Sequence, residues 1–389
     1  MMQNVSSPWS SPLCPSPPLW HFDWAEAFAD FDWVKPMIDC PQDPVFHAEG
    51  DVATHVRLVC EKLISMDEWR GLNETERNIV FLAAALHDVA KPECTVIDSQ
   101  GRISSAGHGQ RGAQLVRRIL WQGDGFAKSP PPLFVREAVS ALVRFSSLAF
   151  WFWDKGDPER AVIQTSQCAR LDLLAILAEA DAGGRQCRDI GDLLSKIEFF
   201  REYAKEKSCF SGPYPFASEH SRFLYFHRSS SIAQDPGRHA YDDTRFQVTV
   251  MSGLPAAGKD HWIKENAGAL PVISLDEIRL KLGIEAEQDQ SRVLKSARET
   301  ARSLMRQNQS FVWNATNVTR YMRDPLIRFF RDYGARIRIV YVEPLRYEEL
   351  LKRNASRPNP LPSRIIEKLA DKLEVPDLTE AHELVYVIN

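Results

Sequence analysis

Residues 253–260 have the types and spacing of a loop that binds phosphate. They follow a mostly apolar, β-branched run at 247–251 and are Gly253, Leu254, Pro255, Ala256, Ala257, Gly258, Lys259 and Asp260. In such loops, glycines let backbone N–H groups approach an anion, a lysine reaches the β- and γ-phosphates, and a helix begins just behind. The pattern predicts a site for ATP or another nucleoside triphosphate. The alternative is a glycine-rich turn between a strand and a helix that binds no ligand.

The residue after the lysine departs from the usual pattern. That position normally carries Ser or Thr, whose hydroxyl binds Mg²⁺, and here it is Asp260. A carboxylate also binds Mg²⁺, directly or through water. We therefore expect Mg²⁺ at this loop, with Asp260 as its contact.

Further polar residues follow the other strands expected in this region. Strands at 271–275, 311–315 and 336–342 alternate with helices, which predicts a parallel sheet with ligands at the carboxyl ends of its strands. Asp276 follows the first of these strands, which we expect next to the phosphate loop, and there it is a candidate general base for an acceptor hydroxyl. Its alternative role is to cap the following helix. Arg279, one turn later, is a candidate to hold the acceptor.

Other residues of this region are candidate contacts to nucleotide or substrate. A helix at 347–357 and the proline-rich run after it are expected to form a lid. The expected contacts to the ATP phosphates are Arg353 and Arg357, and the expected substrate contacts besides Arg279 are Asn317 and Arg320. For the arginines, the alternative is an ordinary solvated helix face.

In the first half of the chain, expected helices each place a His or an Asp at an apolar face. His55 lies near the apolar stripe of one helix, His87 and Asp88 end a buried helix at about 74–89, and Asp181 continues the apolar face of a helix at 171–179. Two imidazoles and two carboxylates suit a divalent metal with open positions for water and a phosphate oxygen. His108 is a fifth candidate ligand or a substrate contact. Taken singly, each of these residues has an alternative as a hydrogen-bonded core residue.

Three cationic residues lie near these metal candidates in the sequence. Lys91, Arg144 and Arg185 are candidates to neutralise a phosphodiester beside the metal. Their alternative is solvated surface charge.

Composition limits the kind of protein and its partners. A chain of 389 residues with 44% hydrophobic residues is long enough for two domains with separate cores. The net charge of −4 predicts no attraction of the whole molecule to nucleic acid, so any polyanion site is local. Seven scattered cysteines favour reduced thiols in a cytoplasmic protein. No apolar run is long enough to span a bilayer, so no membrane partner is expected.

The expected organisation follows from these patterns. Residues 1–19 are rich in Ser and Pro and are expected to be a disordered tail. Residues 20–207 form an all-α domain that opens with an aromatic cluster at 20–33. Residues 208–245 form an irregular connector, with a possible strand at 223–226. Residues 246–389 form an α/β domain with a parallel sheet.

The first domain resembles the HD phosphohydrolase superfamily, and locally the HD domain of bacterial CCA-adding tRNA nucleotidyltransferases. The likeness lies in residues 47–55, in 86–91 with the glycines and histidine at 107–112, and in 178–185. It implies an all-α fold with metal ligands His55, His87, Asp88 and Asp181, and a transition metal such as Mn, Ni, Co or Zn. Some relatives carry another His where this chain reads Leu-Val-Arg-Phe-Ser-Ser at 142–147, so a single metal is expected.

The second domain resembles the polynucleotide 5′-kinases among the P-loop kinases. The likeness lies in the loop at 253–259, in Asp276 with Arg279, in residues 314–317 and in the arginine-bearing lid. Together, the two domains resemble bifunctional bacterial HD–polynucleotide kinase proteins.

These resemblances imply an enzyme that heals the ends of RNA, or of DNA. The kinase would phosphorylate 5′-OH ends, and the HD domain would remove a 2′,3′-cyclic phosphate or a 2′- or 3′-phosphate, with an RNA ligase as a functional partner. One alternative is a kinase and phosphohydrolase of free nucleotides. Another is a nucleotide sensor with an inert HD domain.

Overall fold

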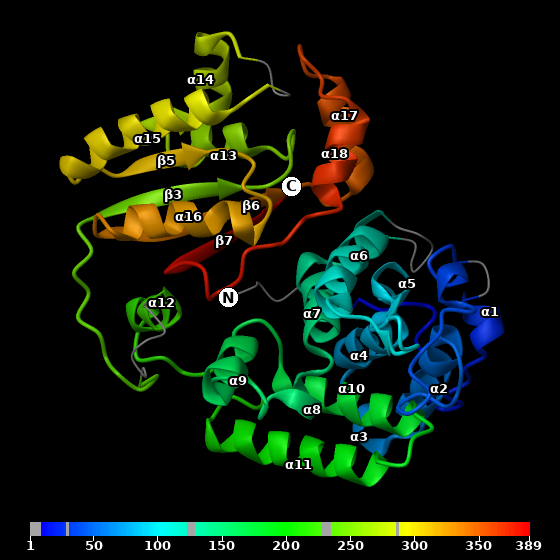
Figure 1. Ribbon diagram of the computed structural model, residues 1–389. Coiled ribbons are helices and arrows are strands. Elements are labelled where there is room, and N and C mark those ends of the chain that lie inside the picture. The colour runs from blue at the N-terminus through cyan, green and yellow to red at the C-terminus, as the bar shows by residue number, and fades with distance from the viewer. Residues whose placement is uncertain (1–8, 29–30, 123–128, 228–234, 285–287) are drawn as a thin grey trace. The chain divides into compact units, whose positions relative to one another are not determined.

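The chain forms two compact units, Met1–Pro215 and Phe216–Asn389. The structure is a computed structural model that describes residues 9–28, 31–122, 129–227, 235–284 and 288–389 (Figure 1). No single described helix has both the length and the apolar character to cross a membrane; the bent pair of helices at Pro158–Ser166 and Leu171–Gly184 meets that test only jointly. None of the seven cysteines, all within the described ranges, forms a disulfide.

The N-terminal unit is helical, as expected, apart from one short hairpin. Its elements are α1 (Trp24–Phe28), η1 (Lys35–Met37), α2 (Val52–Ser65), α3 (Asp67–Arg70), α4 (Glu74–Leu86), α5 (Lys91–Cys94), β1 (Val96–Ile97), β2 (Ile103–Ser104), α6 (His108–Gln122), α7 (Leu133–Phe145), α8 (Leu148–Trp151), α9 (Pro158–Ser166), α10 (Leu171–Gly184) and α11 (Ile190–Glu206). Helices α2, α4, α7 and α10 contact one another around a common apolar core.

Local sequence explains where the central helices begin. Asp51 caps α2, since its Oδ1 accepts a hydrogen bond from the N–H of Thr54 at 2.7 Å. Asn73 caps α4 in the same way through the N–H of Glu76. Helix α4 is buried almost all round, so the two residues at its end, His87 and Asp88, are delivered into the interior.

The Ser/Pro-rich stretch at 9–19 is ordered against this unit. The Asn78 Oδ1 atom accepts a hydrogen bond from the N–H of Ser11 at 2.7 Å, and Trp9 and Leu13 contact the apolar core. The prediction of a disordered tail is therefore wrong for this stretch, because its few large apolar residues are anchored. Residues 1–8 lie outside the described residues.

The C-terminal unit is built on one parallel sheet. Its elements are α12 (Glu219–His227), β3 (Phe246–Ser252), α13 (Lys259–Asn266), β4 (Val272–Ser274), α14 (Leu275–Leu282), α15 (Ser291–Arg306), β5 (Phe311–Asn314), α16 (Arg320–Arg331), β6 (Ala335–Glu343), α17 (Tyr347–Ala355), α18 (Ser363–Ala370) and β7 (Glu383–Ile388). The strand order is β4-β5-β3-β6-β7, with every neighbouring pair parallel (Figure 1). The α/β class and the parallel sheet are confirmed.

Alternate residues of the central strand face two different apolar clusters. Val248 and Val250 lie in a cluster with side chains of α15 and α16, whereas Met251 lies in a cluster with Ile263 of α13. Because β3 is buried on both faces and lies in the middle of the sheet, the loop that follows it is anchored to the best-packed part of the unit.

Two features of this unit differ from the prediction. Residues 223–226 belong to helix α12 rather than to a strand, and α12 is part of the C-terminal unit rather than of a connector. His220, Phe223 and His227 recur at helical spacing, and Phe223 stacks on His382 with ring centroids 3.9 Å apart. Strand β7 was not predicted.

Candidate metal centre and phosphate-binding loop

Three predicted ligands meet in the N-terminal unit. His55 of α2, His87 at the end of α4 and Asp181 of α10 each offer a ligand atom, and these atoms all lie within 4.8 Å of one another. The Nε2 atom of His55 lies 3.2 Å from Asp181 Oδ1. All three residues are buried. Donors from three separate helices thus converge on one point.

A glycine at the contact between α2 and α10 explains how these donors come together. A Cβ atom at Gly184 would lie 2.6 Å from Val59 Cγ2 and 2.7 Å from the backbone N of Val59. Gly184 is one turn beyond Asp181, and Val59 is one turn beyond His55. As expected, the helix ends at this glycine, which also permits the close approach to α2.

Asp88 and His108 lie beside the three converging ligands. Asp88 Oδ2 is 3.3 Å from His87 Nε2 and 2.7 Å from the ammonium of Lys91. Burial alone would raise the pKa of Asp88, but His87 and Lys91 together hold it well below its usual range, so the carboxyl is ionised. His108 Nε2 lies 3.7 Å from Asp88 Oδ1, and its Nδ1 contacts the carbonyl of Ser105. His108 is therefore farther from the cluster than the other candidates.

The chemistry of the cluster fits a divalent cation. The Nε2 atoms of His55 and His87 are buried, yet neither makes a well-directed hydrogen bond. Buried polar atoms without partners are costly, and a cation bound between them and the carboxylates would remove that cost. Imidazole nitrogens with carboxylate oxygens are the donor set that Mn, Ni, Co or Zn accepts.

Sequence reasoning did not assign a role to Glu49 or His47. Glu49 Oε1 lies 2.8 Å from His55 Nδ1 and 2.8 Å from His47 Nδ1. Burial by itself would raise the pKa of Glu49, but contacts with the two imidazoles lower it. An ionised Glu49 places the ring proton of His55 on Nδ1 and leaves Nε2 free to bind a metal. The sequence feature that could have indicated this contact is the close spacing of His47, Glu49 and His55.

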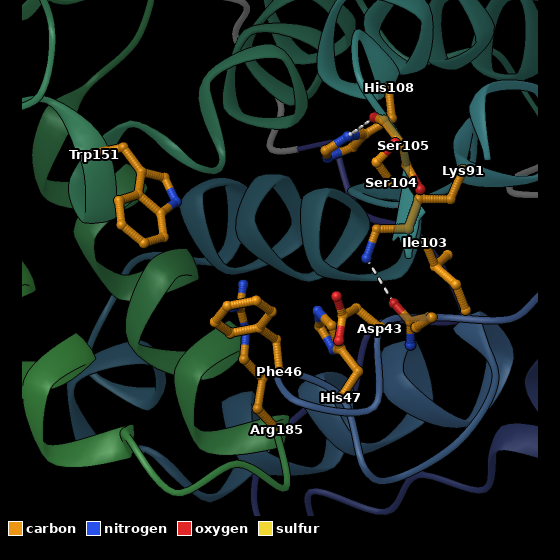
Figure 2. Close-up of a pocket in the computed structure, with 11 residues that line it drawn as sticks. Asp43, Phe46, His47, Lys91, Ile103, Ser104, Ser105, His108, Trp151 and Arg185 are labelled. Atoms are coloured by element: carbon orange, nitrogen blue, oxygen red, sulfur yellow. Dashed lines mark hydrogen bonds between the residues drawn. The ribbon is translucent and has the colours of Figure 1, made fainter. Parts of the chain in front are cut away.

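A cavity of about 230 Å³ adjoins the cluster (Figure 2). Among the predicted cationic residues, Lys91 and Arg185 line it, and Arg144 does not. The guanidinium of Arg185 makes two hydrogen bonds to Asp181, at 2.9 and 2.8 Å. The guanidinium of Arg144 instead lies 5.1 Å from the ring centroid of Phe145.

In the C-terminal unit, residues 253–259 form a tight loop between β3 and α13. Gly253, Ala256 and Gly258 have φ values of 144°, 64° and 104°. A Cβ atom at Gly253 would lie 2.3 Å from the carbonyl oxygen of Val342, so no other residue fits there without a shift of β6. The N–H of Gly253 donates to the carbonyl of Thr316. Both neighbouring strands therefore hold the loop.

The ammonium of Lys259 lies against the loop itself. It donates hydrogen bonds to the carbonyl oxygens of Gly253 at 2.9 Å and Leu254 at 2.8 Å. Burial lowers the pKa of Lys259 to about 8, with a smaller contribution in the same direction from Arg357, and Asp260 and Asp276 oppose the shift. Lys259, the residue predicted to bind phosphate, thus lies at the loop, and the charges of Arg357, Asp260 and Asp276 influence its pKa.

Asp260, in α13 after strand β3, and Asp276, in α14 after strand β4, are the two predicted carboxylates near this loop. Asn314, at the end of β5, donates a hydrogen bond from Nδ2 to Asp260 Oδ1 at 2.7 Å. Asp276 is in the first turn of α14, and its exposed carboxylate pairs with Arg279. The helix cap is Ser274, so the alternative role of Asp276 as the cap is wrong. Strand β5 lies between β4 and β3, so the expected direct neighbourhood of β4 and β3 is wrong too.

The lid candidates are also near the loop. Arg353 donates to Glu349 Oε1 at 3.0 Å and to Asn389 Oδ1. The Asn389 side chain donates in turn to the carbonyl oxygen of Ala257 at 3.3 Å. Asn389 was not predicted as a site residue, because nothing in the sequence shows that β7 ends beside the loop.

Two predicted substrate contacts have internal partners instead. The side chain of Asn317 is buried and donates to the carbonyl oxygen of Met251 at 2.8 Å. The Arg320 guanidinium donates to Asp377 Oδ2 at 3.0 Å and Thr379 Oγ1 at 2.7 Å. These contacts fasten the end of β5 and the segment before β7. In this structure both side chains are thus already paired within the unit, and their contact with substrate stays a prediction.

Comparison with known proteins agrees with the geometry of the C-terminal unit. Residues 248–376 match a protein-family model described as an AAA domain. Similar solved structures include a putative kinase from Chloroflexus aurantiacus, with 18% identity, a TM-score of 0.30, and coverage of 37% of this chain and 86% of that one. A sugar kinase from Janibacter sp. shows 17% identity, a TM-score of 0.29, and coverage of 37% and 85%. Within the C-terminal unit, residues 248–376 are therefore similar to an AAA domain.

Proposed function

We propose that this protein is an RNA end-healing enzyme with two separate phosphate-transfer centres. The observation that carries the proposal is that one chain holds a buried cluster of His and Asp side chains that could bind a metal, and a glycine-rich loop whose Lys259 is influenced by Asp260 and Asp276. Each of these arrangements handles phosphate esters, by different chemistry. The resemblance of the two regions to HD–polynucleotide kinase proteins supports RNA ends as the substrate.

In the kinase unit, the proposed step transfers the γ-phosphoryl group of ATP to a 5′-hydroxyl. The new bond joins the hydroxyl oxygen to phosphorus, the bond to the β-phosphate oxygen breaks, and Asp276 accepts the proton. Lys259 and the loop amides bind the β- and γ-phosphates, and Arg279 orients Asp276 and the acceptor. Arg353 and Arg357 neutralise charge on the transferring group. Asp260, oriented by Asn314, would hold Mg²⁺.

In the N-terminal unit, the proposed reaction is hydrolysis of a 2′,3′-cyclic phosphate or a terminal 2′- or 3′-phosphate. His55, His87, Asp88 and Asp181 would hold the metal, which supplies a bound water of lowered pKa and polarises the phosphoryl oxygen. Glu49 keeps His55 in the binding tautomer. Lys91 lies at the edge of the cavity, where its charge neutralises the phosphate.

One incubation tests both halves of the proposal. The protein is mixed with ATP, Mg²⁺, Mn²⁺ and an RNA that has a 5′-OH and a 2′,3′-cyclic phosphate, and both termini are analysed. We expect a 5′-phosphate and a 3′ end without the cyclic phosphate. If the 3′ end is dephosphorylated completely, the products are the 5′-phosphate and 3′-hydroxyl that an RNA ligase joins. A matched DNA oligonucleotide reports the choice of sugar.

The alternatives predict different results when nucleosides are added to the same incubation and ATP binding is measured beside it. A kinase of free nucleotides would phosphorylate nucleosides and leave the RNA 5′-OH unchanged. A nucleotide sensor would bind ATP tightly and change neither terminus. Either result would overturn the proposal.

A further inference from the structure

The cavity beside the metal cluster has two open aromatic side chains. Phe46 and Trp151 line it, and they remain 47% and 41% exposed, unlike the buried rings next to Trp151. Figure 2 shows the two rings on different segments around the cavity, with Lys91 and His108 farther along its wall. Large aromatic surfaces that line a cavity are costly to leave in water, and a ligand that covers them removes this cost.

The aromatic residues next to Trp151 in the sequence pack within the unit, whereas Trp151 lines the cavity. Phe150 and Phe152 are buried, and Phe150 lies 5.0 Å from the guanidinium of Arg185. Trp153 is exposed, but its ring contacts Phe199, with centroids 5.1 Å apart. Trp151 instead carries the ammonium of Lys196 at 4.4 Å from its ring centroid and also lines the cavity.

The two kinds of lining match the two parts of a nucleotide. The lining includes the cationic side chains of Lys91 and Arg185 and the imidazoles of His47 and His108, which suit a phosphate. Phe46 and Trp151 supply flat apolar surface, where they suit a base. Every base has a π-face, so a stacking surface binds the end of an RNA without reading its sequence.

We propose that Phe46 and Trp151 form a stacking surface for the terminal nucleobase of the RNA whose phosphate reacts at the metal cluster. This inference rests on the proposed function of the N-terminal unit and adds how the substrate is held. It implies that the unit prefers a phosphate attached to a nucleoside over a phosphate on a bare sugar, with little preference among bases.

The test measures binding and turnover in the full-length protein with Mn²⁺. The probes are adenosine 2′-monophosphate, methyl riboside 2′-phosphate, which has no base, and the 2′,3′-cyclic phosphates of both. For Trp151→Ala, we expect the preference for the adenosine compound to fall about tenfold or more, in Kd by calorimetry and in KM, because stacking on one aromatic ring is worth that much. Trp151→Phe should restore most of the preference.

Matched variants show whether the effect belongs to the cavity. Trp153→Ala removes a more exposed tryptophan of the same segment that does not line the cavity, and it should leave the preference unchanged. Phe46→Ala should lower the preference, and Val45→Ala next to it should not. The inference is overturned if Trp151→Ala keeps the wild-type preference, or if Trp153→Ala lowers it equally.

The outcomes also separate this inference from the proposed function. If the protein shows the binding preference but hydrolyses neither cyclic phosphate, the stacking surface stands and the proposed phosphoesterase reaction fails. If hydrolysis occurs and Trp151 has no effect on the preference, the reaction stands and the stacking surface fails.

Discussion

In the proposed kinase reaction, Lys259 is the residue on which phosphoryl transfer would depend most directly. Lys259 contacts the loop carbonyls at hydrogen-bond distance, and its pKa responds to Asp260 and Asp276. We expect Lys259→Met and Asp276→Asn each to lower phosphoryl transfer to an RNA 5′-OH at least about 100-fold. The first change removes positive charge beside the transferring phosphoryl group, and the second removes the carboxylate that accepts the proton. Transfer of labelled γ-phosphate measures this.

The control for this prediction is on the same helix. Lys264→Met removes an exposed lysine of α13 and should leave transfer near the wild-type rate. The Lys259→Met and Asp276→Asn variants should both keep the phosphoesterase activity. Loss of both activities in a folded Lys259 variant would contradict two independent centres.

At the metal cluster, the prediction concerns metal content as well as activity. His87→Ala and Asp181→Asn each remove one of the converging ligand atoms, so we expect each to weaken Mn²⁺ binding at least about tenfold and to lower phosphoester hydrolysis at least about 100-fold. Metal content by mass spectrometry and a Mn²⁺ titration measure the effect. His21→Ala, at an exposed histidine of the same unit, is the control. Full metal content in His87→Ala would exclude this residue as a ligand.

At the scale of elements, the contact between α10 and α2 determines whether the ligands converge. Gly184→Ala places a methyl group against Val59, so the helices must separate. We expect a loss of about 1–3 kcal/mol in the free energy of unfolding, together with weaker Mn²⁺ binding. Urea unfolding and the Mn²⁺ titration measure both.

A second glycine in the same unit provides the comparison. A Cβ atom at Gly191, in the first turn of α11, would meet no atom within 4 Å. Gly191→Ala should therefore be neutral or slightly stabilising, since alanine favours a helix. Equal effects of the two substitutions would show that Gly184 has no special role in bringing the helices together.

The elements that could be predicted from sequence are those whose pattern is local. The apolar stripe and Asp51 cap predicted α2. The apolar run before the phosphate loop predicted β3, and the helix-compatible run after the loop predicted α13. Helix α12 was misassigned because its aromatic residues favour strands, while its partner, His382, lies about 160 residues later in the chain. Strand β7 is a partly exposed edge strand that pairs with β6, and its short segment shows no clear alternation.

The site could be predicted in part for the same reason. Donors at helix ends and strand ends are visible in the sequence, so His55, His87 and Asp181 were identified and do converge. The orientation of His55 by Glu49 depends on side-chain geometry and was missed. Asn317 and Arg320 were assigned to substrate because the acceptors that bind them lie far away in the sequence.

At the scale of the molecule, the boundary between the units makes a direct prediction about fragments. Arg222 of α12 donates to the carbonyl oxygens of Leu378 and His382, and buried Phe223 stacks on His382. A fragment of residues 216–389 should therefore fold, and a fragment of residues 246–389 should unfold at a clearly lower temperature. Circular dichroism during heating measures the difference. Equal Tm values would contradict the assignment of α12 to this unit.

If Lys259 binds ATP as proposed, its lowered pKa makes ATP binding depend on pH. With a pKa of about 8, the free side chain is partly neutral at mildly alkaline pH, and triphosphate anions favour its charged form. Between about pH 8 and 9, ATP binding should therefore draw a hydrogen ion from the buffer, and affinity should fall as pH rises through that range. Calorimetric heats that differ between buffers of unequal ionisation enthalpy would reveal this uptake, and Lys259→Met should abolish the difference.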